Sequence, residues 1–242
     1  MGSARRILDS AAIMVSRAKS SRISVVVSAV AGVSNKLQAA IDSCVAGGQP
    51  TEFVEEIRTI HQSICAEIQG SLPAFNADAV RQAIDKRLSK LESLLSALVT
   101  LGECSTSAHC RIMGMGEQMS SPIVEAVLRA QGQNVVLLDS RKFIYTTGDQ
   151  KEGDPDYIRC ADAFAAYRDN ASGAAQILLF PGSFPDEQER RLLIACPENQ
   201  IPASAAERAG PASCAFTAQF CPAVHRVPAS PKNTCICRHA GL

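Results

Sequence analysis

The run at residues 111–121, RIMGMGEQMSS, places Gly114 and Gly116 directly before the carboxylate of Glu117. Glycine lets the backbone approach another backbone segment or a ligand without steric penalty. A helical pattern follows at once, so two interpretations of Glu117 stand side by side. It is a negative charge that favours the start of its own helix, or it is a carboxylate that binds the cationic group of a substrate.

A second polar stretch, VVVSAVAGVSNKL at residues 25–37, carries the hydroxyls of Ser28 and Ser34. It follows an apolar run typical of a buried strand, and ligands of open α/β sheets bind at the carboxyl ends of the strands. A loop of small residues that leads into a helix N-terminus also suits anions. For Ser34 an equally supported alternative is a plain helix N-cap.

Three short apolar runs predict the strands that position these residues, at residues 23–28, 134–138 and 176–180. Helical patterns separate them, including residues 122–130 and 157–168. Strands that alternate with helices predict an α/β fold, a three-layer sandwich with a largely parallel sheet.

Two long helices are predicted between the first two strands, one from near Thr51 and one from near Asn76 or Asp78. Their apolar stripes are Phe53, Ile57, Ile60, Ile64 and Ile68, and then Val80, Ile84, Leu88, Leu91, Leu95 and Leu98. Such a pair is expected to form a helical hairpin beside the sheet. The start of the chain is amphipathic and basic, as transit peptides are, but its helical spacing favours an ordinary first helix.

The composition, 46% hydrophobic and 20% charged over 242 residues, is typical of a soluble globular protein. The formal net charge of zero gives no basic face for nucleic acid. No apolar run reaches the roughly 18–20 residues that span a bilayer. We therefore expect neither a nucleic-acid nor a membrane partner.

Ten cysteines are present, and half of them lie scattered through the predicted helices and loops without metal-type spacing. Small buried thiols are expected at these positions: Cys44, Cys65, Cys104, Cys110 and Cys160. The other five lie after residue 195 in a proline-rich stretch without a helix or strand period beyond the short run RRLLIA. Three interpretations of this tail stand: an out-of-frame or degenerate stretch, a natural disordered tail, and a metal site with spacing unlike the common zinc patterns.

Read in order, these segments resemble aspartate kinase, of the amino-acid kinase family. The matching features are the strand and loop at residues 25–37, the Leu101–Gly102 step, the Gly-Glu pair at 116–117, the strand NVVLLD at 134–139 and the strand LLFPG at 178–182. The resemblance covers Gly2 to Gly182, with a helical insertion at about residues 34–101. It implies a partial kinase domain at residues 1–184 and an irregular tail at 185–242.

The resemblance implies transfer of the ATP γ-phosphate, with Mg²⁺, to the side-chain carboxylate of L-aspartate. It places a substrate-contacting hydroxyl at Ser34, the partner of the substrate's ammonium group at Glu117, and Ser28 beside the same pocket. It further implies a cytoplasmic protein of lysine and threonine biosynthesis, and a homo-oligomer. It assigns no metal ligand in this chain.

Two family segments have no counterpart in this sequence: the initial Lys-Phe-Gly-Gly-Thr-Ser and the later Gly-Arg-x-Gly-Ser-Asp-Tyr. They supply a lysine, an arginine and an aspartate that serve substrate binding and phosphoryl transfer, which depends on positioning and charge neutralisation. We therefore assign no catalytic residue and expect impaired transfer. The alternatives are a non-catalytic remnant that binds L-aspartate weakly, and an interaction module that associates with a full-length kinase.

Overall fold

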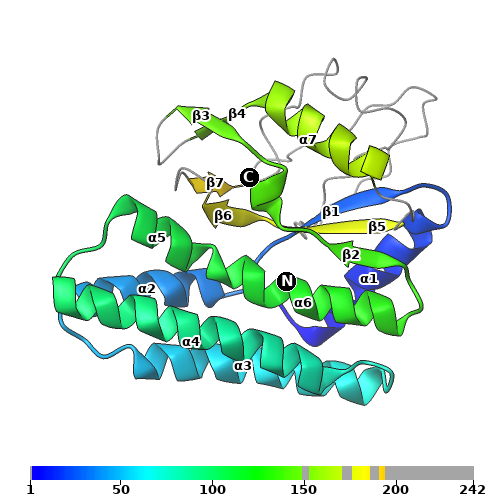
Figure 1. Cartoon of the computed structure of the whole chain (residues 1–242). Coiled ribbons are helices and arrows are strands. Elements are labelled where there is room, and N and C mark those ends of the chain that lie inside the picture. Colours follow the sequence, from blue (N-terminus) through cyan, green and yellow to red (C-terminus); the bar gives the residue numbers. More distant parts are fainter. Residues whose placement is uncertain (1, 149–152, 171–175, 186–190, 194–242) are drawn as a thin grey trace, which may run out of the picture.

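A computed structural model describes residues 2–148, 153–170, 176–185 and 191–193. At its centre lies a parallel three-stranded sheet in the order β1 (Ile23–Val27), β5 (Ile177–Pro181), β2 (Val135–Leu137) (Figure 1). Ile23 and Val135 both pair with Ile177, so the three strands start in register and end at the same edge. The predicted parallel sheet is confirmed.

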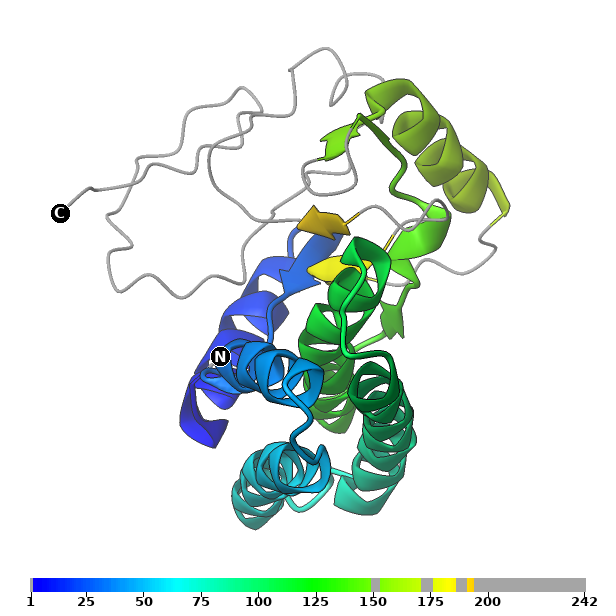
Figure 2. The same ribbon diagram turned by 90° about the vertical axis from the view of Figure 1, so that its left-hand side faces the viewer.

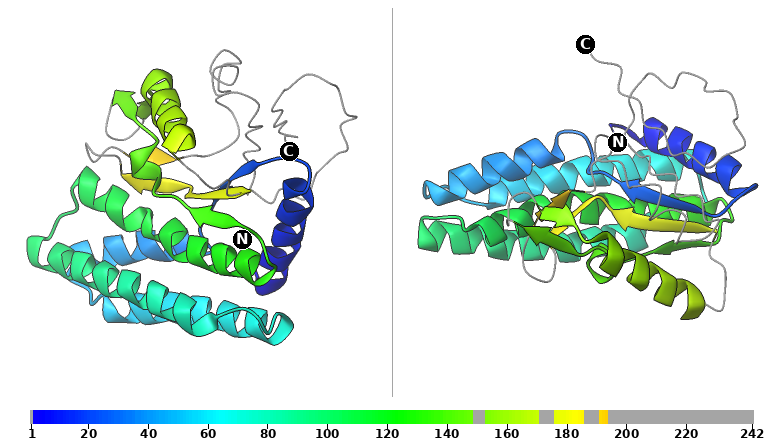
Figure 3. Two further views of the ribbon diagram at one scale, coloured as in Figure 1. Left: turned by 45° about the vertical axis from the view of Figure 1, so that its right-hand side comes forward. Right: turned by 90° about the horizontal axis from the view of Figure 1, so that it is seen from above.

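Helices cover both faces of this sheet, which explains why its strands are almost wholly apolar. On one face α6 (Met115–Ala130) contacts all three strands. On the other, α7 (Tyr157–Asn170) packs through an aromatic cluster in which the ring of Phe143 lies 5.2 Å from Phe164 and 6.0 Å from Phe180. Figure 3 shows the sheet between α7 and the remaining helices. The predicted three-layer α/β architecture is confirmed.

The first helix, α1 (Ala4–Ala18), is an integral part of the core. Its side chains at Ile7 and Ala11 have no exposed surface, and the hydroxyl of Ser3 caps its start by accepting the amide N–H of Arg6. It packs against β1, α3 and α6. The prediction of an ordinary first helix is confirmed.

The predicted hairpin is formed by α3 (Thr51–Ser71) and α4 (Ala77–Leu101), which follow α2 (Val33–Val45). Figure 2 shows these helices grouped beneath the sheet, with α6 between the hairpin and the strands. The hairpin packs on α1, α2 and α6, so it forms a further layer rather than lying beside the sheet as expected.

The apolar stripe of α4 is buried as predicted, but the stripe predicted for α3 is partly wrong. Phe53 and Ile60 are only half-buried, whereas Val54 and His61 are buried. The buried face is rotated toward His61 because α1, α2, α4 and α6 all pack on α3, and their arrangement cannot be read from one helix.

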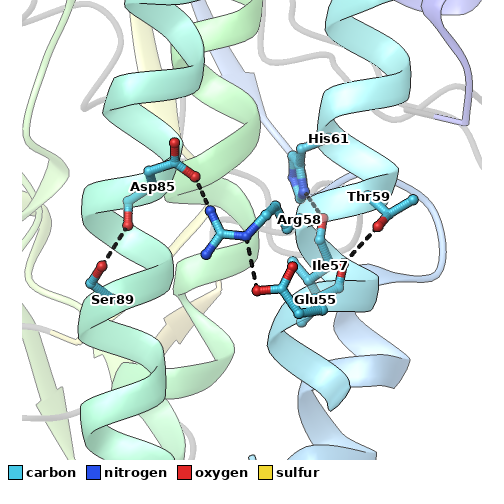
Figure 4. A network of polar contacts seen from close by, with 7 residues as sticks. All are labelled: Glu55, Ile57, Arg58, Thr59, His61, Asp85 and Ser89. Carbon is cyan, nitrogen blue, oxygen red and sulfur yellow. Dashed lines mark hydrogen bonds and ion pairs between the residues drawn. The ribbon is translucent and has the colours of Figure 1, made fainter. Parts of the chain in front are cut away.

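Polar contacts join the two hairpin helices (Figure 4). The guanidinium of Arg58 pairs with Glu55 in its own helix, at 3.1 Å, and with Asp85 of α4. On the buried side, Nδ1 of His61 lies 2.7 Å from the carbonyl oxygen of Ile57. The exposed face of the hairpin is therefore held by charge pairs and the inner face by apolar packing.

The helix predicted for residues 122–130 begins earlier, at Met115, and directly follows a helix that was not predicted, α5 (Thr106–Met113). Proline favours the first turn of a helix, which is why the sequence suggests a start at Pro122. In the structure Pro122 lies inside α6, buried, at a position where proline ordinarily costs about 3 kcal/mol. Burial of α6 against the sheet and the other helices offsets that cost.

Two small antiparallel pairs complete the described chain. They are β3 (Thr146–Gly148) with β4 (Gly153–Pro155), and β6 (Ser183–Pro185) with β7 (Arg191–Leu193). The strand β7 falls within the stretch expected to be irregular, while residues 194–242 and the interpretations of that tail lie outside the described residues. In the described ranges, no helix is both long and apolar enough to cross a bilayer.

Candidate functional site

The carboxyl ends of the three parallel strands form one edge, and hydrogen bonds hold the chain segments that leave it. The amide N–H of Gly182, just after β5, donates to the carbonyl oxygen of Val27 at 2.9 Å. The hydroxyl of Ser140, in the short 3-10 helix after β2, donates to the carbonyl oxygen of Pro181 at 3.0 Å. This is the edge at which open α/β sheets bind ligands.

Glu117 lies in the first turn of α6, whose start contacts the chain just after β1, and is only 8% exposed. The other first-turn carboxylates of long helices, Glu52 in α3 and Asp78 in α4, are exposed. A carboxylate that serves only the helix dipole gains its stabilisation at the surface, without the cost of burial. Burial therefore sets Glu117 apart from the ordinary helix-start residues of this chain.

Gly116 brings the start of α6 against the loop that follows β1. A Cβ atom placed on Gly116 would lie 2.8 Å from the Cβ of Ala29 and 3.6 Å from Cγ1 of Val33. The glycine thus permits contact between helix and loop, which is the first of the two possibilities that the sequence offered, approach to another backbone segment. It also places Glu117 next to the segment that carries Ser28 and Ser34.

Ser34 is the second residue of α2 and is half-buried. The N-cap of α2 is Gly32, which adopts φ 83° and makes no side-chain cap bond. The alternative of Ser34 as the N-cap is therefore wrong. Val33, the neighbour of Ser34, lies close to Gly116, the neighbour of Glu117. Ser34 and Glu117 therefore lie on two segments that touch each other, on the same side of the fold.

Ser28, also half-buried, follows β1 directly, and its carbonyl oxygen accepts a hydrogen bond from the hydroxyl of Ser120 at 2.8 Å. Ser120 has no exposed surface and also lies 3.1 Å from the carbonyl oxygen of Glu117. The sequence analysis did not single out Ser120. The available signal was a serine one helical turn after the glutamate, which becomes meaningful only once the helix is known to start at Met115.

A second polar chain ties α5 to α2. Nε2 of His109 lies 2.8 Å from Oε1 of Gln38, and the amide nitrogen of Gln38 donates to Asp42 at 2.9 Å. Gln38 is one turn beyond Ser34, so this chain continues the helix face on which Ser34 lies. The backbone of β6 lies against α5 and α6, which adds a further wall near the start of α6 (Figure 1).

The cysteines of the described residues behave as packing residues. Cys44, Cys65 and Cys110 are buried and the other two are half-buried, and all are free thiols. Burial raises the pKa of Cys65 to about 11 and also raises the pKa of Cys44. These two side chains are therefore protonated at neutral pH, which makes them poor nucleophiles. Among the described residues, no three histidine, cysteine or acidic side chains are grouped so as to hold a metal ion.

An open groove between α2 and α3, of about 430 Å³, lies outside this arrangement. Its walls are Lys36, Glu52, Glu55, Glu56, Thr59 and Ile60, which include the ion pair of Lys36 with Glu56. None of the predicted site residues lines it. The candidate site is therefore the contact of α6, α2 and the β1 loop.

Solved structures with a similar backbone identify the architecture. This chain superposes on E. coli aspartokinase III in complex with lysine and aspartate with a TM-score of 0.66 and 21% identity, covering 87% of this chain and 44% of that one. The same enzyme in complex with aspartate and ADP gives a TM-score of 0.66 at 22% identity. The chain has the aspartate kinase fold. Clostridium acetobutylicum aspartate kinase matches 89% of this chain with a TM-score of 0.60 and 12% identity.

Curated relatives agree with the aspartate kinase fold. The chain is 22% identical over 149 residues to a bifunctional aspartokinase/homoserine dehydrogenase of Buchnera aphidicola, and 29% identical over 132 residues to an aspartokinase of Chlamydia muridarum. These matches cover 62% and 54% of this chain but only 18% and 26% of the relatives. No protein-family model matches the sequence. The resemblance to aspartate kinases is confirmed, and the chain corresponds to a part of them.

Proposed function

We propose that this chain forms the amino-acid-binding part of an aspartate kinase catalytic domain and binds L-aspartate. Glu117 accepts the ammonium group of the substrate, Ser34 donates its hydroxyl to the substrate, and Ser28 lies beside the same pocket. The observation that carries the proposal is the burial of Glu117 in a first turn that touches Ala29, next to Ser28, and Val33, next to Ser34.

Glu117 is a largely buried carboxylate, and burial of a charge costs free energy. A carboxylate withdrawn from water is destabilising unless a charged or hydrogen-bonding partner compensates it. Besides its partners within the protein, a buried carboxylate such as Glu117 can accept a charge-assisted hydrogen bond from the ammonium group of an amino acid. The start of α2 beside Ser34 has no side-chain cap, and the positive end of its helix dipole favours the anionic end of the same ligand.

Phosphoryl transfer by this chain is a separate proposal, because the chain spans less than half of the solved kinases it matches. The ADP complex of the similar E. coli enzyme supports ATP as the phosphoryl donor. Mg²⁺ is proposed to enter with the phosphates of ATP, since Mg²⁺ is held largely by substrate phosphates and water. A homo-oligomer in the cytoplasm that serves lysine and threonine biosynthesis completes the proposal.

Calorimetry of the full chain with L-aspartate tests binding, with Glu117→Gln as the decisive variant. Loss of one charge-assisted hydrogen bond is expected to weaken binding by roughly 10- to 150-fold. Glu52→Gln is the matched control, because it removes an exposed carboxylate from the first turn of another helix. It should leave the affinity unchanged, and thermal unfolding should confirm that both variants fold.

A coupled ATP assay then separates the classes of function. Turnover supports aspartate kinase activity, and binding without turnover supports the non-catalytic remnant. Absence of L-aspartate binding by the wild-type chain refutes the proposed function and favours an interaction module. Equal affinities for Glu117→Gln and Glu52→Gln would overturn the role of Glu117.

A further inference from the structure

We infer that Ser120 is a positioning residue, which fixes the start of α6 to the end of β1 and thereby sets where Glu117 lies relative to Ser28 and the start of α2. Its role in affinity rests on the proposed function. The hydrogen bonds of the Ser120 hydroxyl are properties of the fold and can be tested without a ligand.

The hydroxyl of Ser120 has one proton and two acceptors within reach. The carbonyl oxygen of Ser28 lies at 2.8 Å and that of Glu117 at 3.1 Å, so the bond to Ser28 is the shorter. Ser28 and Ser120 are 92 positions apart in the sequence. The side chain of Ser120 therefore connects the first residue after β1 with the turn that carries Glu117.

Burial makes this connection hard to replace. Ser120 has no exposed surface, so water does not readily take over when the hydroxyl is removed. The carbonyl oxygen of Ser28 would then lose a partner on the side covered by Ser120, and an acceptor left without its hydrogen bond away from water is costly. Gly116 allows the same turn to lie close to Ala29, so the hydroxyl of Ser120 and the missing side chain of Gly116 both contribute to one contact between α6 and the residues after β1.

Ser121 is a matched control within the same helix. It is also fully buried, and its hydroxyl donates to the carbonyl oxygen of Glu117 at 2.6 Å. That bond stays inside α6 and does not reach β1. Ser120→Ala and Ser121→Ala thus remove the same atoms at equal burial, and they differ in whether the bond between helix and strand is lost.

Amide hydrogen exchange of the ligand-free full chain is the first measurement. Ser120→Ala should accelerate exchange by about 3- to 10-fold in both segments, residues 28–33 and 115–119, as expected for the loss of one hydrogen bond. Ser121→Ala should affect only the helical segment. Should Ser120→Ala fail to fold, Ser120→Cys keeps nearly the same volume with a weak donor. Identical exchange in the Ser120 and Ser121 variants would overturn the inference.

Calorimetry with L-aspartate is the second measurement. The dissociation constant of the Ser120 variant should be about 3- to 10-fold higher than that of Ser121→Ala. Both are measured at a temperature well below the midpoints of thermal unfolding of the two variants. If exchange responds but affinity does not, the positioning role is refuted. If the wild-type chain binds no L-aspartate, the proposed function is refuted, while the exchange experiment still decides whether Ser120 holds helix and strand together.

Discussion

Replacing Gly116 by alanine tests whether the contact between α6 and the β1 loop is as tight as the structure indicates. The added Cβ would lie 2.8 Å from the Cβ of Ala29, whereas carbon atoms pack best at roughly 3.5–4.0 Å. The Ala29 methyl is fixed to the backbone and cannot rotate away, so the helix or the loop must shift by several tenths of an ångström or more.

The magnitude follows from two opposing effects. Overpacking of this kind destabilises the folded state by about 1–3 kcal/mol, whereas exchanging glycine for alanine in a helix stabilises it by about 0.5–1 kcal/mol. We expect a net loss of about 1–2 kcal/mol in the free energy of unfolding, or roughly 2–8 °C in the midpoint of thermal unfolding. Affinity for L-aspartate should fall as well, because Glu117 moves with the turn.

The control is Gly70→Ala in α3, where a Cβ would meet nothing within 4 Å. The same substitution should stabilise the protein there by about 0.5–1 kcal/mol. Adding Ala29→Gly to Gly116→Ala should relieve the clash, which a double-mutant cycle by thermal unfolding would detect as favourable coupling. A Gly116→Ala variant as stable as the wild type, or no coupling with Ala29→Gly, would refute the close contact.

Two further predictions concern the helical hairpin. Burial lowers the pKa of His61, although the hydrogen bond to the Ile57 carbonyl opposes this shift. Below about pH 6.5 the imidazole therefore binds a proton more readily in the unfolded chain than in the folded one. Stability should fall as the pH drops through this range, and His61→Leu should flatten the dependence when unfolding is followed at pH 7.5 and 5.5; equal slopes would contradict the assignment. The side chain of Asn76 caps α4 through a 3.0 Å bond from the amide of Ala79, so Asn76→Ala should cost about 1 kcal/mol of unfolding free energy while Asn76→Asp retains it. Urea denaturation that ranks the two variants equally would rule out the cap.

The candidate site could be located from sequence only in outline. A strand followed by small residues and hydroxyls, and a glycine pair before a carboxylate, are local patterns that indicate where ligands bind. The burial of Glu117 and the bond between Ser120 and Ser28 involve partners about ninety residues apart. No local pattern specifies such a pairing, so the sequence analysis could name Glu117 but not the serine that holds its turn in place.

The sequence by itself determined the elements: the apolar runs of the sheet, the buried stripe of α4 and the alternation that makes an α/β fold. These follow from side-chain periodicity, which each segment expresses alone. The tertiary structure decided the order of the strands, the start of α6 before Pro122 and the rotation of α3 that buries His61. Each of these is set by packing against several other elements at once, and packing between distant segments outweighs the weaker local preferences.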